Sequence, residues 1–163
     1  MKRILWTISC GLLIAGTARA DEIKTEDAET AVRNWIRAEA SPLGTRMGRA
    51  VSGIRSFTDF DGTALFHLAE LDGGGFVILS ADDDVEPVLA FSDKGAFSAS
   101  EDNALWVLLQ RDLPLRTGLL KRVKQSVKGG EAANPNQAAW RRLLDVSEGR
   151  KYASKNTSEI SDL

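Results

Sequence analysis

The stretch "ALFHLAELDGGGFVILS", residues 64–80, decides the fold. Its two halves are rich in apolar residues, and the four residues "DGGG" (72–75) separate them. Glycine adopts the positive φ angles that tight turns between antiparallel strands need. The sequence therefore predicts a hairpin of two strands, residues 63–71 and 76–81. Because both strands are apolar at nearly every residue, we expect them in the centre of a sheet with both faces covered.

Segments on both sides of this hairpin extend the pattern. "IRSF" (54–57) and "VLAFS" (88–92) predict two further short strands. Ahead of them, "TEDAETAVRNWIRAEA" (25–40) predicts an amphipathic helix, since its apolar residues recur at helical spacing. Thr25 is expected to cap this helix.

A second, longer helix is predicted after the strands, over residues 98–127. Ser98 and Glu101 have the spacing of a capping box, with Ser100 as an alternative cap. Pro114 lacks an N–H and is expected to kink the helix or make it restart. The order helix, antiparallel strands, helix has no βαβ alternation. It predicts the α+β class, with a small antiparallel sheet of three to four strands packed with an N-terminal helix and a long C-terminal helix.

The two ends of the chain differ from this central part. Lys2 and Arg3, an apolar stretch over residues 4–16 and the small residues Ala18 and Ala20 have the order of an export signal, with cleavage after Ala20. We therefore expect an exported protein, periplasmic or extracellular. The expected division is a signal at 1–20, a domain at 21–127, and a linker, short helix and polar tail at 128–163.

Removal of the signal would change both charge and cysteine content. Cys10 is the single cysteine and lies in the signal, so the mature chain would have no disulfide and no thiol nucleophile. Of the 21 Lys and Arg residues 18 would remain against 23 acidic residues, a net charge of about −5. That charge argues against a nucleic-acid or anionic-membrane partner.

One motif invites an enzymatic interpretation. Asp59, Asp61, Gly62 and Thr63 spell D-x-D-G-T, the pattern around the nucleophile of haloacid-dehalogenase-type phosphatases. That nucleophile has to follow a buried parallel strand, whereas the clear strand here comes after the motif. We therefore interpret the motif as a turn, in which Asp side chains bond to nearby backbone and glycine takes a positive φ.

Other candidate chemistry also has a structural explanation. The glycines at 73–75 lie between two strands, and a phosphate loop would open a helix. "ADDDVE" (81–86) matches no calcium-loop spacing and predicts a solvated acidic turn. His67 is expected to be a partly buried strand residue. No catalytic constellation, metal site or cofactor site is predicted, so the chain is not expected to be an enzyme.

The segment from Ala64 to Leu109 resembles the pro-segment of streptopain-family cysteine peptidases and the free-standing inhibitors of the Spi type. The shared series is a strand, a Gly-rich turn, "GGFVILSADDD", Pro with an apolar strand, "GAF", an Asn and an amphipathic helix. The resemblance extends over residues 26–124 or so. Two departures are Ala81, where Gly is commoner, and Pro114 within the helix.

The resemblance implies a small α+β unit that covers the active-site cleft of a streptopain-like cysteine peptidase. A loop just before the long helix reaches the catalytic residues in this family. Here that loop is "SASEDN", with Phe97 as its anchor and Asn103 as the intruding asparagine, across a one-residue gap. The expected contact residues are Phe97, Ser98, Ser100, Glu101, Asp102 and Asn103. The alternative for Asn103 is a place in the first turn of the helix.

Three interpretations of the whole chain follow. It is a free-standing inhibitor acting in trans, or the N-terminal fragment of a peptidase precursor acting in cis. Alternatively it is a periplasmic binding module without inhibitory activity. The first two predict binding to a cysteine peptidase, and the third predicts none.

Overall fold

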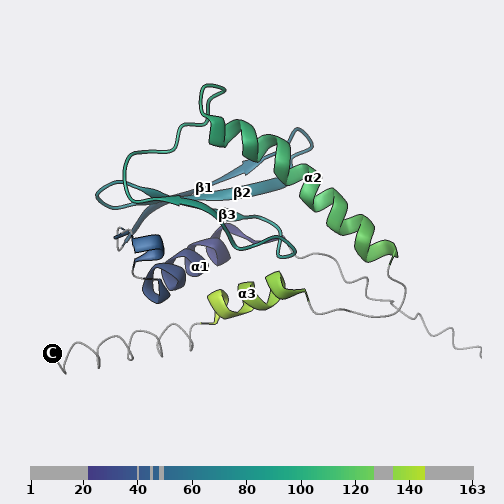
Figure 1. Ribbon diagram of the computed structural model, residues 1–163, viewed down its shortest axis with the longest axis horizontal. Helices are drawn as coiled ribbons and strands as arrows, with labels where there is room; N and C mark the ends of the chain where they lie inside the picture. The colour runs from purple at the N-terminus through teal and green to yellow at the C-terminus, as the bar shows by residue number, and fades with distance from the viewer. Residues whose placement is uncertain (1–21, 40, 45, 48–49, 127–133, 146–163) are drawn as a thin grey trace, which may run out of the picture.

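The fold is a four-stranded antiparallel sheet between two layers of helices (Figure 1). The computed structural model describes residues 22–39, 41–44, 46–47, 50–126 and 134–145. Its elements are α1 (Thr25–Ala38), the 3-10 helix η1 (Pro42–Gly44), β1 (Val51–Thr58), β2 (Ala64–Leu71), β3 (Phe76–Ser80), β4 (Val88–Ser92), α2 (Ala104–Ser126) and α3 (Pro135–Leu144). The predicted α+β class is confirmed.

The predicted hairpin is confirmed as β2 and β3. Residue 67 of β2 pairs with Leu79 of β3, and the three glycines between the strands have φ angles of 82°, 98° and 92°. The sheet order is β1-β2-β3-β4, so β2 and β3 are the central strands, as expected. β1 is longer than the predicted residues 54–57, because it pairs with β2 from Val51 to Thr58.

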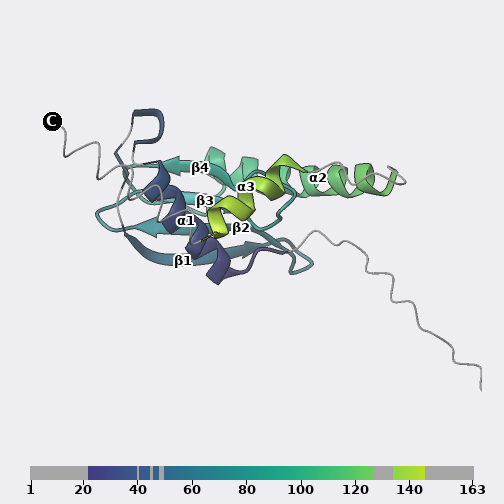
Figure 2. The same cartoon turned by 90° about the horizontal axis from the view of Figure 1, so that it is seen from below.

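Successive side chains of β2 and β3 pack alternately in two separate hydrophobic cores. Four of them point to the face that α1 and α3 cover, namely Ala69, Leu71, Val77 and Leu79. Phe66, Leu68 and Ile78 point to the opposite face, which α2 covers. Figures 1 and 2 show α1 and α3 on one side of the sheet and α2 on the other. Since successive strand residues face opposite sides, apolar residues at every position are what two covered faces require.

The start of α1 differs from the prediction. Thr25 is the first helical residue, and Lys24 before it has extended backbone and no side-chain cap. The Thr25 hydroxyl instead bonds to the Ser56 hydroxyl of β1, at 3.0 Å between the oxygens. The predicted Thr25 cap is therefore wrong, because this side chain ties α1 to the sheet.

The position of α2 also differs from the prediction. The helix begins at Ala104, so the predicted capping box of Ser98 and Glu101 is wrong. It then runs through Pro114 to Ser126 as one helix, so it does not restart there. Pro114 is exposed, and the Thr117 hydroxyl donates to the carbonyls of Leu113 and Pro114.

The last helix, α3, is anchored by a buried tryptophan. Trp140 is 2% exposed, packs in the core beneath α1, and donates its indole N–H to the Val85 carbonyl at 3.1 Å. Asn134 caps the helix through the amide of Asn136, and Pro135 occupies the first turn. Trp140 therefore anchors α3 to the rest of the fold. The predicted signal and polar tail lie outside the described residues.

Candidate functional site

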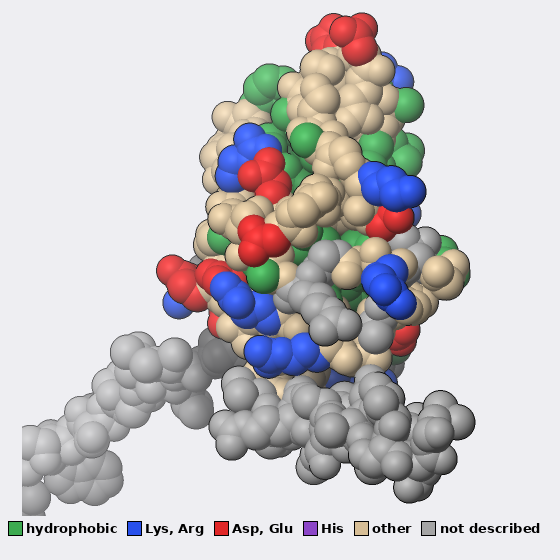
Figure 3. Space-filling model, turned by 90° about the vertical axis from the view of Figure 1, so that its left-hand side faces the viewer, with side chains coloured by type: hydrophobic (Ala, Val, Ile, Leu, Met, Phe, Trp, Pro, Cys, Tyr) green, Lys and Arg blue, Asp and Glu red, His purple; other side chains and the backbone are tan. Residues whose placement is uncertain are grey.

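The loop Phe97–Asn103 joins β4 to α2 and protrudes from the domain. It lies at the top of the molecule in Figure 1, on the side of the sheet that α2 covers. Figure 3, which keeps the same vertical axis, shows acidic side chains at this apex. Ser98, Glu101 and Asp102 are exposed and Ser100 is half-buried. The loop is convex, and it lines neither the cavity of about 390 Å³ nor the one of about 350 Å³.

Phe97 fixes the first end of the loop. Its side chain is 7% exposed and lies among four other aromatic rings, with centroid distances of 5.5 to 6.3 Å to the rings of Phe57, Phe66, Phe76 and Trp106. These rings meet at steep angles, the arrangement in which the positive edge of one ring meets the negative face of another. The aromatic cluster therefore ties the loop to β1, β2, β3 and α2.

Asn103 fixes the second end. Its Nδ2 donates to the Ser98 carbonyl at 2.7 Å, and its Oδ1 accepts from the Leu105 amide at 3.1 Å. The Asn103 amide N–H also donates to the Ser100 carbonyl at 3.0 Å. Asn103 thus caps α2 and closes the loop on itself, which explains why α2 begins at Ala104. An Asn just before "ALWVLL" is a cap signal that sequence reasoning could have ranked above Ser98.

His67 lies in β2 and is not part of this loop. It is 2% exposed, so it is more deeply buried than the sequence suggested. Its Nε2 donates to the Ile23 carbonyl at 2.7 Å, which leaves Nδ1 to accept from the Ser56 hydroxyl at 2.8 Å. Burial lowers the pKa of His67 below its ordinary value, against the opposing effects of the Ile23 hydrogen bond and of Glu22. These contacts give His67 a structural role in joining the N-terminal segment to the sheet.

The D-x-D-G-T motif is a turn, as predicted. The Asp59 carboxylate accepts from the amides of Asp61 and Thr63, both at 2.9 Å, and Gly62 has a φ of 79°. These bonds connect β1 to β2 at the end of an antiparallel pair. The position differs from that of a phosphatase nucleophile, which follows a parallel strand.

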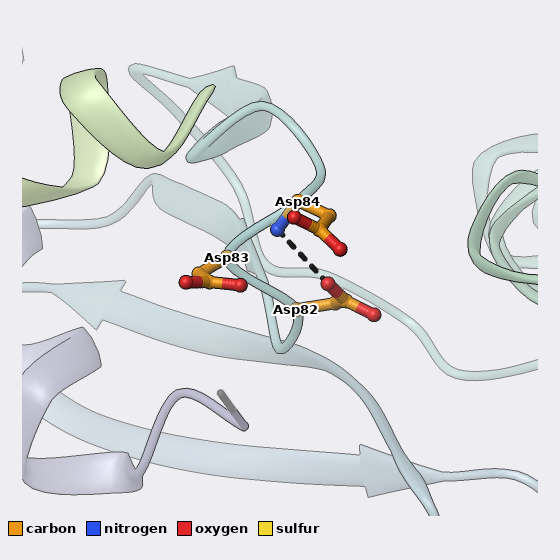
Figure 4. Close-up of side chains that lie close together, drawn as sticks. All are labelled: Asp82, Asp83 and Asp84. Atoms are coloured by element: carbon orange, nitrogen blue, oxygen red, sulfur yellow. Dashed lines mark hydrogen bonds between the residues drawn. The ribbon is translucent and has the colours of Figure 1, made fainter. Parts of the chain in front are cut away.

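The acidic turn after β3 is less solvated than predicted. Figure 4 shows Asp82, Asp83 and Asp84 close together, with the Asp84 amide donating to the Asp82 carboxylate at 2.9 Å. One carboxylate oxygen from each residue lies within 4.8 Å of the other two, so among the described residues these three form a group that could hold a metal ion. Asp84 is only 1% exposed. The expectation of a solvated turn is therefore wrong for Asp84.

Asp84 is buried because α3 docks on it. Its carboxylate accepts from the side-chain amides of Asn134 and Gln137, both at 3.0 Å. Its backbone carbonyl accepts from Asn134 at 3.2 Å and from Asn136 at 2.7 Å. Several charge-assisted bonds compensate a carboxylate for lost hydration. Sequence reasoning missed this role, because the partners lie some 50 residues further along the chain.

Comparison with known proteins identifies one family for this chain. A sequence model of the Spi protease inhibitor family matches residues 20–112, more than half of the chain. This match spans α1, the sheet, the loop and the first part of α2. No curated protein and no solved structure matches the chain. None of the described helices has the length and apolarity needed to cross a membrane. On the family match, the chain belongs to the Spi protease inhibitor family.

Proposed function

We propose that the chain inhibits a streptopain-like cysteine peptidase by inserting the loop Phe97–Asn103 into the active-site cleft, and that it catalyses no reaction itself. The observation that supports this proposal is a protruding, exposed loop held at both ends, by the Phe97 ring and by the Asn103 amide. Membership of an inhibitor family makes a protease the expected partner.

The shape and order of the loop suit insertion into a cleft. A convex segment fills a concave site, and a segment that is ordered before binding loses less conformational entropy on binding. Phe97 and Asn103 provide that order in the free chain. The exposed carboxylates of Glu101 and Asp102 suit the catalytic imidazolium of a cysteine peptidase, because opposite charges favour encounter and orientation.

Asn103 acts first as a positioning residue in this proposal. Both functional groups of its amide are engaged within the loop, at Ser98 and at Leu105. A direct bond from Asn103 to the catalytic thiolate would use the second N–H of its amide, since Nδ2 carries two. Because Asn103 is half-buried, we assign the first contacts to the exposed residues Ser98, Glu101 and Asp102, with Ser100 beside them.

The proposal also places the inhibitor and the peptidase in one compartment. Residues 1–20 have the composition of an export signal, so we place the inhibitor in the periplasm or outside the cell. The peptidase then acts in the same compartment, either as a separate chain or as the remainder of one precursor.

Inhibition of a purified streptopain-type peptidase by residues 21–163 tests the proposal. We expect the wild-type chain to inhibit, and a variant with Glu101→Ala and Asp102→Ala to raise the inhibition constant at least about tenfold. The matched control is Glu26→Ala with Asp27→Ala in α1, a helix on the opposite face of the sheet. This control should inhibit like the wild type.

Two substitutions of Asn103 separate its shape-setting role from a direct contact. Asn103→Asp keeps an acceptor for the Leu105 amide and loses the donor to Ser98, whereas Asn103→Ala loses both. We expect Asn103→Ala to weaken inhibition more than Asn103→Asp does. A folded wild-type chain that inhibits none of several such peptidases would contradict the proposal and favour a binding module.

A further inference from the structure

Helix α2 carries an exposed apolar stripe. Leu108, Leu115, Leu119 and Val123 are 59%, 66%, 60% and 58% exposed, and their spacing places them on one side of the helix. Figures 1 and 2 show the second half of α2 projecting past the end of the sheet. A row of exposed apolar side chains over about 22 Å of helix is the signature of an interaction surface.

Opposite charges lie at the two ends of this stripe. The loop before α2 presents the exposed acids Glu101 and Asp102, and the exposed base Arg122 lies beside the stripe near its other end. A second copy of the helix in antiparallel orientation would bring the acidic end of each to the basic end of the other. The same orientation opposes the two helix dipoles favourably. A parallel arrangement would bring like charges together.

We propose that α2 is the interface of an antiparallel homodimer with two-fold symmetry. Placing the two-fold axis beside Asp112 sets Leu108 of one copy between Leu115 and Leu119 of the other, because residues equidistant from the axis face each other. The same register sets Asp102 across from Arg122, so the dimer has to dissociate before the loop enters a peptidase cleft.

The centre of this interface is compatible with Asp112. The Arg116 Nε lies 2.5 Å from the Asp112 carboxylate, so the acid already has a cationic partner on its own helix. Arg116 also bonds to Glu86, which holds its guanidinium beside the stripe. Two such Asp112–Arg116 pairs meet across the axis, flanked by the leucines of both copies.

Sedimentation of residues 21–163 over a range of concentrations tests the dimer. We expect a reversible monomer–dimer equilibrium whose dissociation constant rises at least about 100-fold with Leu115→Gln and Leu119→Gln together. The matched control replaces two exposed apolar residues outside the stripe, Leu43→Gln with Phe60→Gln. This control should leave the equilibrium unchanged. Circular dichroism would verify that every variant is folded.

Charge reversal tests the antiparallel register. One variant carries Asp102→Lys, and the other carries Arg122→Glu. Each should dimerise more weakly than the wild type, while an equimolar mixture should form the heterodimer, in which both charge contacts are attractive. A chain that is monomeric at all concentrations would overturn the proposal. So would a dimer that is insensitive to the stripe substitutions, or a mixture that associates no better than its components.

Discussion

Gly75 occupies the tightest point of the hairpin between β2 and β3. Its φ of 92° is one that side chains rarely allow, and a Cβ atom there would lie 2.5 Å from the Ser92 carbonyl oxygen. Its amide donates to the Gly95 carbonyl at 2.8 Å, so the hairpin turn packs directly on the turn after β4. The run of glycines thus does more than permit a turn, since at Gly75 the backbone of another turn takes the place of a side chain.

We expect Gly75→Ala to destabilise the fold by more than about 3 kcal/mol, because it combines an unfavourable φ with a clash against backbone. Gly73→Ala is the control, since Gly73 has a similar φ of 82° but no atom within 4 Å of the added methyl group. The control should cost about 1–2 kcal/mol. Urea unfolding of both variants measures the difference, and equal costs would refute the close approach.

At the scale of elements, sequence patterns predicted the helices and strands that are determined by neighbouring residues. The apolar runs around "DGGG" gave the hairpin, and the residues 88–92 of β4 agree with the prediction. The start of α2 was missed because Ser98, Ser100 and Asn103 are all good caps, and only the bonds of Asn103 decide among them. The burial of Asp84 was missed because it depends on α3, which is distant in sequence.

The sequence likewise predicted only part of the structure of the candidate loop. The family resemblance implied Phe97 as the anchor of the loop, and its aromatic cluster now accounts for that role. No pattern in the sequence indicates that Asn103 bonds to Ser98, since that bond depends on the conformation of the whole loop. Contact with a peptidase by these residues stays a prediction.

Helix α3 should depend strongly on its tryptophan. Trp140→Ala removes a fully buried indole and its bond to Val85, so we expect a loss of about 3–5 kcal/mol in the free energy of unfolding. Arg141→Ala, at an exposed neighbouring position, should change it by less than about 0.5 kcal/mol. Thermal unfolding followed by circular dichroism distinguishes the two. A stable Trp140→Ala variant would mean that α3 does not hold the fold together.

At the scale of the molecule, one imidazole links three parts of the chain. His67 of β2 bonds to Ile23 before α1 and to Ser56 of β1, and Ser56 in turn bonds to Thr25 of α1. The Ser56 hydroxyl donates its one hydrogen to Nδ1 of His67, so the Thr25 hydroxyl is the donor in the bond between Thr25 and Ser56. The neutral form of His67 therefore completes a network that spans α1 and the β1–β2 pair.

Stability should consequently fall in mild acid. Burial holds the folded pKa of His67 below the unfolded value of about 6.5, so the unfolded chain binds more protons between the two values. The free energy of unfolding then decreases as the pH falls below about 6.5 toward the folded pKa, by at most about 1.4 kcal/mol per pH unit.

Urea unfolding between pH 7.5 and 5.5 measures this slope. The chain has one histidine, so His67→Gln removes imidazole titration altogether. We expect the variant to be less stable at pH 7.5 and to show a flatter pH dependence over this range. An equally steep slope in the variant would assign the acid sensitivity to carboxylates.

The sheet order β1-β2-β3-β4 also bears on how fast the chain folds. Every strand pairs with its neighbour in sequence, so the loops that must close to build the sheet are short, and such topologies fold quickly. The contacts of Asn134 with Asp84 span 50 residues and close a much longer loop. We therefore expect the meander to form first and α3 to dock last, so that in residues 21–163 with Trp35→Phe and Trp106→Phe the fluorescence of Trp140 reports the slowest step of refolding.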